Sequence, residues 1–164
     1  MDAGGVTGAA PLFRMEGVSK RYGGVRALEN AELSVQVGSI HAILGENGAG
    51  KSTTIKCLTG LLRPSGGEMR ILGIDPLVDP VEIKRRVGVV PEDLALFDRL
   101  TAAETLNFVA QVHGIDAATA RQRTADLLGL MDLAEAGSTL VTDFSHGMRK
   151  KLSLAAALLP APRL

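Results

Sequence analysis

The sequence is poor in aromatic side chains and nearly free of cysteine. It contains no Trp, one Tyr and four Phe among 164 residues, and its single cysteine is Cys57. One cysteine cannot form an internal disulfide, which excludes a disulfide-stabilised secreted scaffold and is typical of a reducing compartment. Because apolar residues still make up 46% of the chain, we expect a core built from Leu, Val, Ile and Ala.

The sequence also lacks an excess of charge and a long apolar run. Eighteen basic residues balance eighteen acidic ones, whereas a nucleic-acid-binding domain usually carries a basic excess, so we expect no nucleic-acid partner. The longest apolar stretches, residues 33–45 and 152–162, contain polar or helix-breaking residues and fall short of the ~18 residues that a transmembrane helix needs. Residues 1–11 resemble no secretory signal and are expected to form a loose tail. We therefore expect a protein of the cytosol or of the cytosolic face of a membrane.

The first half of the chain has the pattern of an α/β fold. Leu33, Val35 and Val37 alternate with polar residues, and residues 39–44 form a short apolar run that is typical of a strand buried on both faces. A Gly-rich loop and a helix follow. Two more short strands are predicted at residues 68–72 and 87–90, with a helical segment at 81–86 between them.

The second half is predicted to be helical. Thr101 and Glu104 form a capping-box pattern, and Gly114 should end the helix that they begin. Two further helices are indicated by apolar residues at helical spacing, namely Ala120, Thr124, Leu127, Leu128 and Met131 in one, and Met148, Leu152, Ala155, Ala156 and Leu159 in the other.

The Gly-rich loop carries the clearest chemical signal. Residues 45–52 fit the pattern G-x-x-x-x-G-K-[ST] with Gly45, Glu46, Asn47, Gly48, Ala49, Gly50, Lys51 and Ser52. Glycines let backbone N–H groups approach phosphate oxygens, the lysine places a cation against the β and γ phosphates, and the Ser52 hydroxyl suits Mg²⁺. An accidental Gly-rich turn is the alternative. The dinucleotide pattern G-x-G-x-x-G fails because position 53 is Thr53, which disfavours NAD or FAD.

The order of motifs around this loop resembles the ATP-binding domain of ABC transporters. Tyr22 lies upstream of the loop, and Phe144-Ser145-His146-Gly147-Met148 lies far downstream, where it opens a helix. The resemblance covers residues 12–164. It implies a P-loop NTPase core with an antiparallel β region at residues 12–92, a helical subdomain at 93–144 and a signature helix at 145–164.

The resemblance assigns a role to each motif. Tyr22 matches the aromatic residue that stacks on adenine, although a Tyr packed beside a turn would look the same. The phosphate loop with Thr53 binds the phosphates of ATP, Ser52 and Glu92 lie near Mg²⁺, and Lys51 and Glu92 are the catalytic candidates. The family usually has Gln where this chain has Glu92, so a plain surface Glu is the alternative there.

The signature motif departs from its usual form, Leu-Ser-Gly-Gly-Gln. This chain keeps Ser145 and Gly147, while Phe144, His146 and Met148 differ. In the family this motif faces the ATP of a second subunit, so Ser145, His146, Gly147 and Met148 are expected to touch a partner's nucleotide; a simple capped helix is the alternative. The Ser-His-Gly-Met form together with Glu92 is similar to exporters of drugs, lipids or polysaccharides.

Other polar residues suggest no separate site. The three histidines and Cys57 lack metal-ligand spacing. His41 is expected to be a core or half-buried histidine, and His113 is expected at a helix end, where imidazole suits the negative end of the dipole. Arg149, Lys150 and Lys151 are expected to form a solvated face, with a phosphate or lipid contact as the alternative.

The function implied by the resemblance is that of an ATP-binding transporter subunit. Its cofactors would be ATP and Mg²⁺, and its partners a membrane-spanning subunit and a second ATP-binding domain in a head-to-tail dimer. The family's acidic pair, an Asp and a Glu after a later apolar strand, does not occur here, so the chain is expected to lack the C-terminal part of the domain and not to hydrolyse ATP alone. A non-hydrolytic nucleotide-binding remnant and a soluble ABC-type ATPase without a transport role are the alternatives.

Overall fold

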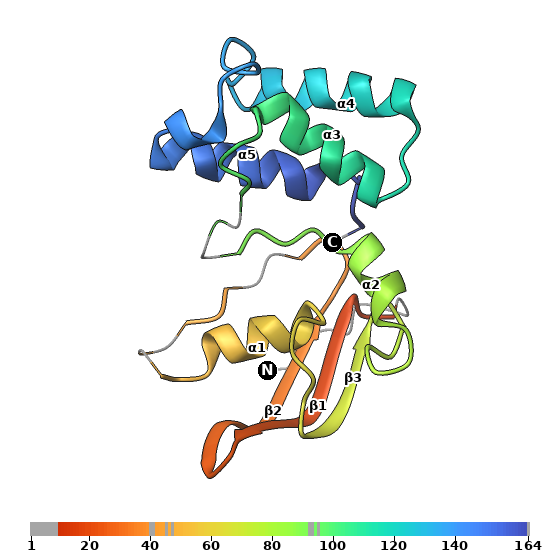
Figure 1. Ribbon diagram of the computed structural model, residues 1–164. Coiled ribbons are helices and arrows are strands. Elements are labelled where there is room, and N and C mark those ends of the chain that lie inside the picture. Colours follow the sequence, from red (N-terminus) through yellow and green to blue (C-terminus); the bar gives the residue numbers. More distant parts are fainter. Residues whose placement is uncertain are drawn as a thin grey trace, which may run out of the picture. The chain divides into compact units, whose positions relative to one another are not determined.

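The computed structural model describes residues 10–39, 42–44, 46, 48–91, 94 and 96–163. The chain divides into two compact units, Met1–Lys84 and Arg85–Leu164, which Figure 1 draws in red to green and in green to blue. The predicted boundary at residue 92 stays a prediction, and most of the predicted tail lies outside the described residues.

The first unit is built on an antiparallel sheet with strand order β2-β1-β3. The strands are β1 (Phe13–Tyr22), β2 (Val25–Val35) and β3 (Gly66–Ile71). β1 and β2 form a hairpin whose turn, at Gly23 and Gly24, begins with a φ of +57° at Gly23, a value that favours glycine. β3 pairs with the other edge of β1, from Phe13↔Ile71 to Ser19↔Gly66.

Two helices accompany this sheet, α1 (Lys51–Leu58) and α2 (Pro80–Arg86). α1 contacts β2, and Figure 1 draws it beside the strands. The buried apolar side chains of this unit come from the strands and from both helices: Met15, Val18, Val35, Cys57, Leu58, Met69, Ile71 and Ile83. The antiparallel region and both helices agree with the sequence prediction.

Two predicted strands are absent from the described residues. Residues 39 and 42–44 form no ladder, and Leu44 is 89% exposed. Residues 87–90 are also irregular: Arg163 N–H donates to the Arg86 carbonyl at 2.8 Å, and Gly88 lies against the Ala157 carbonyl. The strand predicted at residues 87–90 was wrong, and the described part of 39–44 is not a strand either, while residues 40 and 41 lie outside the described residues. A strand needs a hydrogen-bonding neighbour as well as apolar residues, and the described residues of neither segment have one in the described sheet.

The second unit is helical, as predicted. It contains α3 (Ala102–Val112), α4 (Ala117–Leu130), the short 3₁₀ helix η1 (Val141–Asp143) and α5 (His146–Leu158). The α3, α4 and α5 helices contact one another and lie side by side in Figure 1. Within the described residues, no helix is long and apolar enough to cross a membrane.

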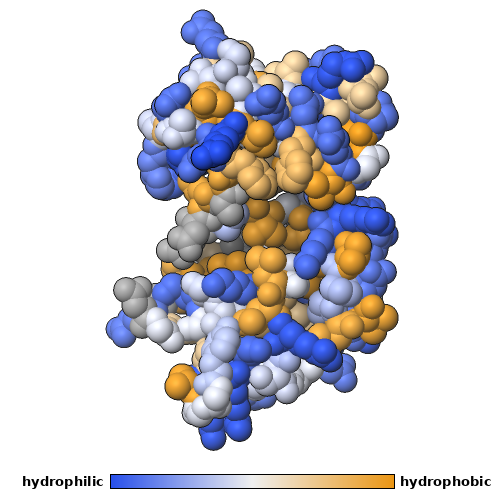
Figure 2. Space-filling view, in the orientation of Figure 1, coloured by the Kyte–Doolittle hydropathy of each residue, from blue (hydrophilic) through white to orange (hydrophobic). Residues whose placement is uncertain are grey.

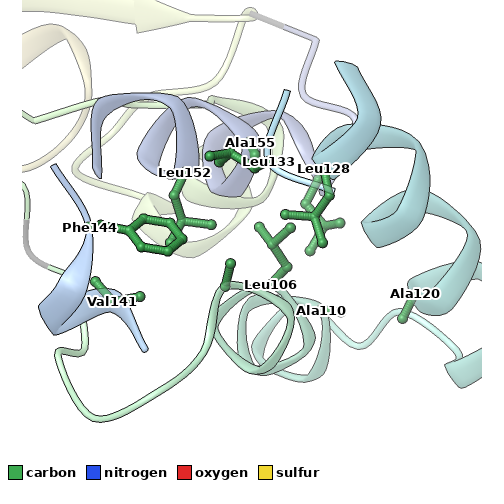
Figure 3. Close-up of a cluster of buried hydrophobic side chains, with 11 residues drawn as sticks. Leu106, Ala110, Ala120, Leu128, Leu133, Val141, Phe144, Leu152 and Ala155 are labelled. Carbon is green, nitrogen blue, oxygen red and sulfur yellow. The ribbon is translucent and has the colours of Figure 1, made fainter. Parts of the chain in front are cut away.

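The core of the helical unit is formed by the predicted apolar stripes. Figure 3 shows Leu106, Leu128, Leu133 and Leu152 pointing toward one another. The full buried cluster has contributions from each helix and from the loops between them: Ala102, Leu106, Ala110, Ala120, Leu128, Leu133, Val141, Phe144, Leu152, Ala155 and Leu159. This core holds the start of α5 against η1, because Val141 and Phe144 are buried directly before it.

Local hydrogen bonds define the helix starts in this unit. Thr101 and Glu104 form the predicted capping box: the Thr101 hydroxyl accepts from the Glu104 N–H at 3.2 Å, and a Glu104 carboxylate oxygen accepts from the Thr101 N–H at 2.8 Å. These bonds hold the pKa of the Glu104 carboxyl below its usual range. The Asp116 carboxylate caps α4, and hydrogen bonding to Thr119 is the main reason why the pKa of Asp116 is also lowered. The predicted end of α3 is confirmed at Gly114, which has a φ of +69°.

Candidate functional site

The phosphate loop leads directly into the first turn of α1. Gly48 and Gly50 have φ values of +89° and +82°, and Lys51 is the first helical residue. The Lys51 ammonium donates to the Glu46 carbonyl at 2.7 Å, and the Ala49 N–H donates to the same oxygen at 3.1 Å. Lys51 is thereby held over the loop. Gly45 and Asn47 lie outside the described residues.

The charges at this helix start favour an anion. A helix N-terminus carries a partial positive charge, and carboxylates are the side chains that usually stabilise it. The first turn of α1 instead has the cation of Lys51 and no acidic residue. Two positive sources therefore point toward the same loop, an arrangement that a bound phosphate would stabilise.

Gly50 has a second role that the motif pattern did not reveal. A Cβ atom at this position would lie 2.7 Å from the Ala27 carbonyl oxygen and 3.4 Å from Leu28 Cδ1, both on β2. Gly50 therefore lets the loop pack directly on the backbone of the sheet. Sequence reasoning missed this contact because it joins residues more than twenty positions apart, and no local signal could have identified it.

Ser52 and Thr53 follow Lys51 in the first turn of α1. The Ser52 side chain is exposed, whereas Thr53 is half-buried. Mg²⁺ keeps several waters and takes one or two protein oxygens beside phosphate oxygens, so an exposed hydroxyl next to the phosphate loop fits that ion. No group of three or more His, Cys, Asp or Glu in the described part of the chain could hold a metal by itself. Glu92, the other predicted metal contact, lies outside the described residues.

Tyr22 ends β1 at the hairpin turn and is 49% exposed. The Lys20 ammonium lies over its ring, 5.3 Å from the ring centroid. The unit that carries Tyr22 also carries the phosphate loop. The partly exposed ring offers a flat surface for a base, which is the feature that stacking requires.

The signature residues lie in the helical unit, at the start of α5. Ser145 is the N-cap, and its hydroxyl accepts from the Met148 N–H at 3.2 Å. The predicted helix start is thereby confirmed. His146, Gly147 and Met148 form the first turn, and among the residues that the structure describes a Cβ on Gly147 would meet the Ser145 hydroxyl alone, at 3.9 Å. This helix end can present backbone N–H groups to an anion.

An ion pair joins α5 to Asp98, which lies shortly before α3. A guanidinium nitrogen of Arg149 donates to the Asp98 carboxylate at 2.7 Å, and the Asp98 carbonyl accepts from the Thr142 N–H at 3.1 Å. Arg149 is 25% exposed, so it is not the fully solvated charge that the sequence suggested. Lys151 does lie at the surface, 3.5 Å from the Asp132 carboxylate.

The remaining candidates behave as ordinary structural residues. Cys57 is buried; burial raises the pKa of its thiol, and the Lys20 charge opposes part of that rise. His113 is the C-cap of α3, where it was predicted. His41 lies outside the described residues.

Most of the chain matches one known protein family. The family described as "ABC transporter" matches residues 28–164. The daunorubicin resistance ATP-binding protein DrrA3 of Streptomyces coeruleorubidus is 37% identical over 156 residues, which cover 95% of this chain and 49% of that protein. The ribose import ATP-binding protein RbsA 1 of Mesorhizobium japonicum is 41% identical over 95% of this chain and 32% of its own.

A solved structure agrees with these sequence matches. The structure of an ATP-binding subunit of an ABC transporter superimposes with a TM-score of 0.84 at 33% identity, over 92% of this chain and 63% of the other. The chain spans about half the length of the drug-resistance relatives that it matches.

Proposed function

The chain belongs to the ABC transporter ATP-binding family, and on that premise we propose that it binds MgATP and powers a membrane transporter. The predicted α/β P-loop NTPase fold is confirmed by the family match and by the solved ATP-binding subunit. The observation that carries the proposal is the start of α1, where Lys51 and the positive helix end converge on a glycine-lined loop with no acidic residue in the first turn.

Each group at this loop has a separate task in the proposed site. The Lys51 ammonium turns from the Glu46 carbonyl to the β and γ phosphates, which are stronger acceptors because they are charged. Backbone N–H groups at residues 45–53 would bind the phosphate oxygens, and the Ser52 hydroxyl would hold Mg²⁺. Tyr22 stacks on adenine. Mg²⁺, when bound, neutralises the charge that develops on the transferred phosphoryl group.

The signature residues complete a second subunit's site. Ser145, His146, Gly147 and Met148 present the N-terminus of α5, and we propose that this end meets the γ-phosphate of ATP held by the partner in a head-to-tail dimer. A single copy then supplies only half of each composite site. Glu92, which lies outside the described residues, would help to hold Mg²⁺ through a water and would not activate the attacking water.

Hydrolysis needs more than the binding loop. Attack on the γ-phosphate requires an oriented water and a metal kept in place, and the family assigns these tasks to an adjacent Asp and Glu. No Asp is followed directly by Glu in the 164 residues, and the one adjacent acidic pair, Glu92-Asp93, has the reverse order. We therefore propose that this 164-residue chain binds ATP without hydrolysing it by itself.

The helical unit is the proposed contact to a membrane-spanning partner, at the cytoplasmic face of the membrane. Phe97 and Phe108 form an edge-to-face pair with ring centroids 5.1 Å apart, yet they remain 52% and 44% exposed. Figure 2 shows such apolar residues interspersed among hydrophilic ones on the surface of this unit. Exposed aromatic anchors are typical of protein interfaces. Crosslinks from residues 101–131 to a membrane protein would support this contact, and crosslinks to soluble proteins alone would contradict it.

The proposed cargo class is a drug, lipid or polysaccharide that is exported. The support is similarity to resistance proteins whose names state a drug, namely daunorubicin, linearmycin and bacitracin. Deletion of the gene should raise the sensitivity of the cell to one such compound. Unchanged sensitivity together with loss of uptake of a sugar would favour import, the direction that the names of two relatives, both ribose import ATP-binding proteins, state.

The binding proposal is tested by calorimetry with ATP on Lys51→Ala. Charge-assisted hydrogen bonds contribute about 1.5–3 kcal/mol each, so the variant should bind ATP at least about tenfold more weakly. Lys56→Ala is the matched control, because Lys56 is an exposed lysine in the last turn of the same helix. Equal affinity of Lys51→Ala and Lys56→Ala for ATP would refute the assignment.

A further inference from the structure

The Lys20 ammonium makes two contacts, one with the Tyr22 ring and one with the Arg63 carbonyl. Lys20 lies half-buried on β1, and its ammonium lies 5.3 Å from the centroid of the Tyr22 ring. This distance is within the ~6 Å range of a cation–π contact. The same ammonium donates to the Arg63 carbonyl at 2.7 Å. A lysine tied at both points has little freedom to swing into solvent.

Its neighbours on β1 bind the same segment. The Ser65 N–H donates to the Ser19 carbonyl at 2.8 Å, and the Arg21 N–H donates to the Ser65 hydroxyl at 3.2 Å. Residues 63–65 follow directly on the turn that ends α1, the helix that begins at Lys51. Three consecutive residues of β1 therefore attach the strand end that carries Tyr22 to the chain that leaves this helix.

The phosphate loop approaches Lys20 from the other strand. Lys20 pairs in register with Leu28 on β2, and Leu28 Cδ1 lies 3.4 Å from the position of a Cβ on Gly50. The Lys20 charge also acts on the buried thiol of Cys57 on α1. Lys20 thus contacts Tyr22 and the chain that leaves α1, and it pairs with a residue of β2 that neighbours the phosphate loop.

From this geometry we infer that Lys20 is a positioning residue for the adenine-stacking ring. Its ammonium holds one face of Tyr22 and leaves the exposed part of the ring for the base. The inference rests on the proposed role of Tyr22 in binding adenine. A ring that is oriented before ATP arrives loses less conformational freedom on binding, and this preorganisation strengthens binding without any contact between Lys20 and the nucleotide.

The chain supplies its own optical probe for a test. Tyr22 is its only tyrosine and it has no tryptophan, so tyrosine emission reports the surroundings of this ring alone. The 164-residue chain is titrated with MgATP while emission is recorded, and its affinities for MgATP and for inorganic triphosphate are measured by calorimetry. Lys20→Met keeps the unbranched stem without the charge. Lys20→Arg keeps a cation that stacks on aromatic rings.

Lys20→Met should bind ATP about two- to fivefold more weakly, an effect whose upper limit is set by the strength of an exposed cation–π contact, because Lys20 can preorganise the ring by no more than that. Its affinity for triphosphate should be unchanged, and ATP should quench its tyrosine emission less. Lys20→Arg should restore most of both properties. Lys84→Met is the matched control, because it removes one exposed lysine charge from α2 of the same unit; it should match the unmodified chain.

Each contrary result has a distinct meaning. If Lys20→Met binds ATP as Lys84→Met does while ATP still quenches Tyr22, the inference is wrong and the proposed function stands. If the variant loses equal affinity for ATP and triphosphate, Lys20 acts on the phosphates or on folding, and the inference is again wrong. If ATP does not alter tyrosine emission in the unmodified chain, the adenine role of Tyr22 fails and the inference fails with it.

Discussion

Replacing Gly50 by Ala should destabilise the first unit more than the same change at Gly48. Both glycines belong to the phosphate loop, and both have φ near +80° to +90°. They differ in their surroundings: a Cβ at Gly50 would lie 2.7 Å from the Ala27 carbonyl oxygen, whereas a Cβ at Gly48 would have no atom of the described residues within 4 Å. The pair therefore separates the requirement for a left-handed backbone from the requirement for space.

The two costs can be estimated separately. A left-handed backbone costs a residue with a Cβ about 1–2 kcal/mol, and both variants carry this cost. Forcing an extra carbon into a packed contact adds about 1–3 kcal/mol, and only Gly50→Ala carries this second cost, because Ala27 belongs to a paired strand that cannot easily shift. We expect losses in the free energy of unfolding of about 1–2 kcal/mol for Gly48→Ala and about 2–4 kcal/mol for Gly50→Ala.

Urea unfolding followed by circular dichroism measures this difference. The midpoint should fall further for Gly50→Ala than for Gly48→Ala, with the slope of the transition unchanged. Equal losses for the two variants would show that the loop does not pack on β2. In that case Gly50 is required for phosphate approach alone, as the motif pattern suggests.

Four further predictions concern the nucleotide, a helix cap, pH and activity. Tyr22→Ala should weaken the binding of ATP by about 1–3 kcal/mol, the value of a base–aromatic stack, and should leave the binding of inorganic triphosphate unchanged in calorimetry. Equal losses of affinity for the two ligands would make Tyr22 merely structural. Ser145→Ala should lower the free energy of unfolding of the helical unit by about 1 kcal/mol, as loss of an N-cap does, and an unchanged urea midpoint would contradict the cap. Asp116 has a lowered pKa in the folded state, so its contribution to the free energy of unfolding is complete above the ordinary pKa of about 3.9 and is lost as pH falls through the folded pKa. Asp116→Asn keeps a capping oxygen and should therefore lose less stability than the unmodified chain over that acid range. Parallel acid unfolding curves for the two proteins would contradict this. The 164-residue chain should release no phosphate from ATP at a measurable steady-state rate, and robust release that Lys51→Ala abolishes would prove it catalytically complete.

The helical half was predicted well because its signals are local. Thr101 and Glu104 satisfy each other's backbone N–H groups across three positions, and Ser145 does the same for Met148. Such bonds form wherever the chain turns into a helix, so their residues indicate the helix start without knowledge of the rest of the fold. The apolar stripes in these helices obey the same short period and became the buried core.

The phosphate loop could also be predicted from the sequence, because each fixed residue in it has a task set by its own chemistry. Gly48, Gly50 and Lys51 occur at the expected start of a helix, with the two glycines in the left-handed backbone conformation. Their roles toward ATP stay predictions.

Only the tertiary structure decided which distant segments meet. The sequence by itself could not place Gly50 on Ala27, Lys20 between Tyr22 and Arg63, or Arg149 on Asp98. It also misjudged residues 87–90, which are half-buried or exposed and pair with no strand of the described sheet, and in which a Cβ on Gly88 would lie 2.7 Å from the Ala157 carbonyl oxygen. The reason is physical: a cap or a helical stripe depends on residues three or four positions apart, whereas these contacts depend on how the whole chain reverses direction and which surfaces remain to be buried.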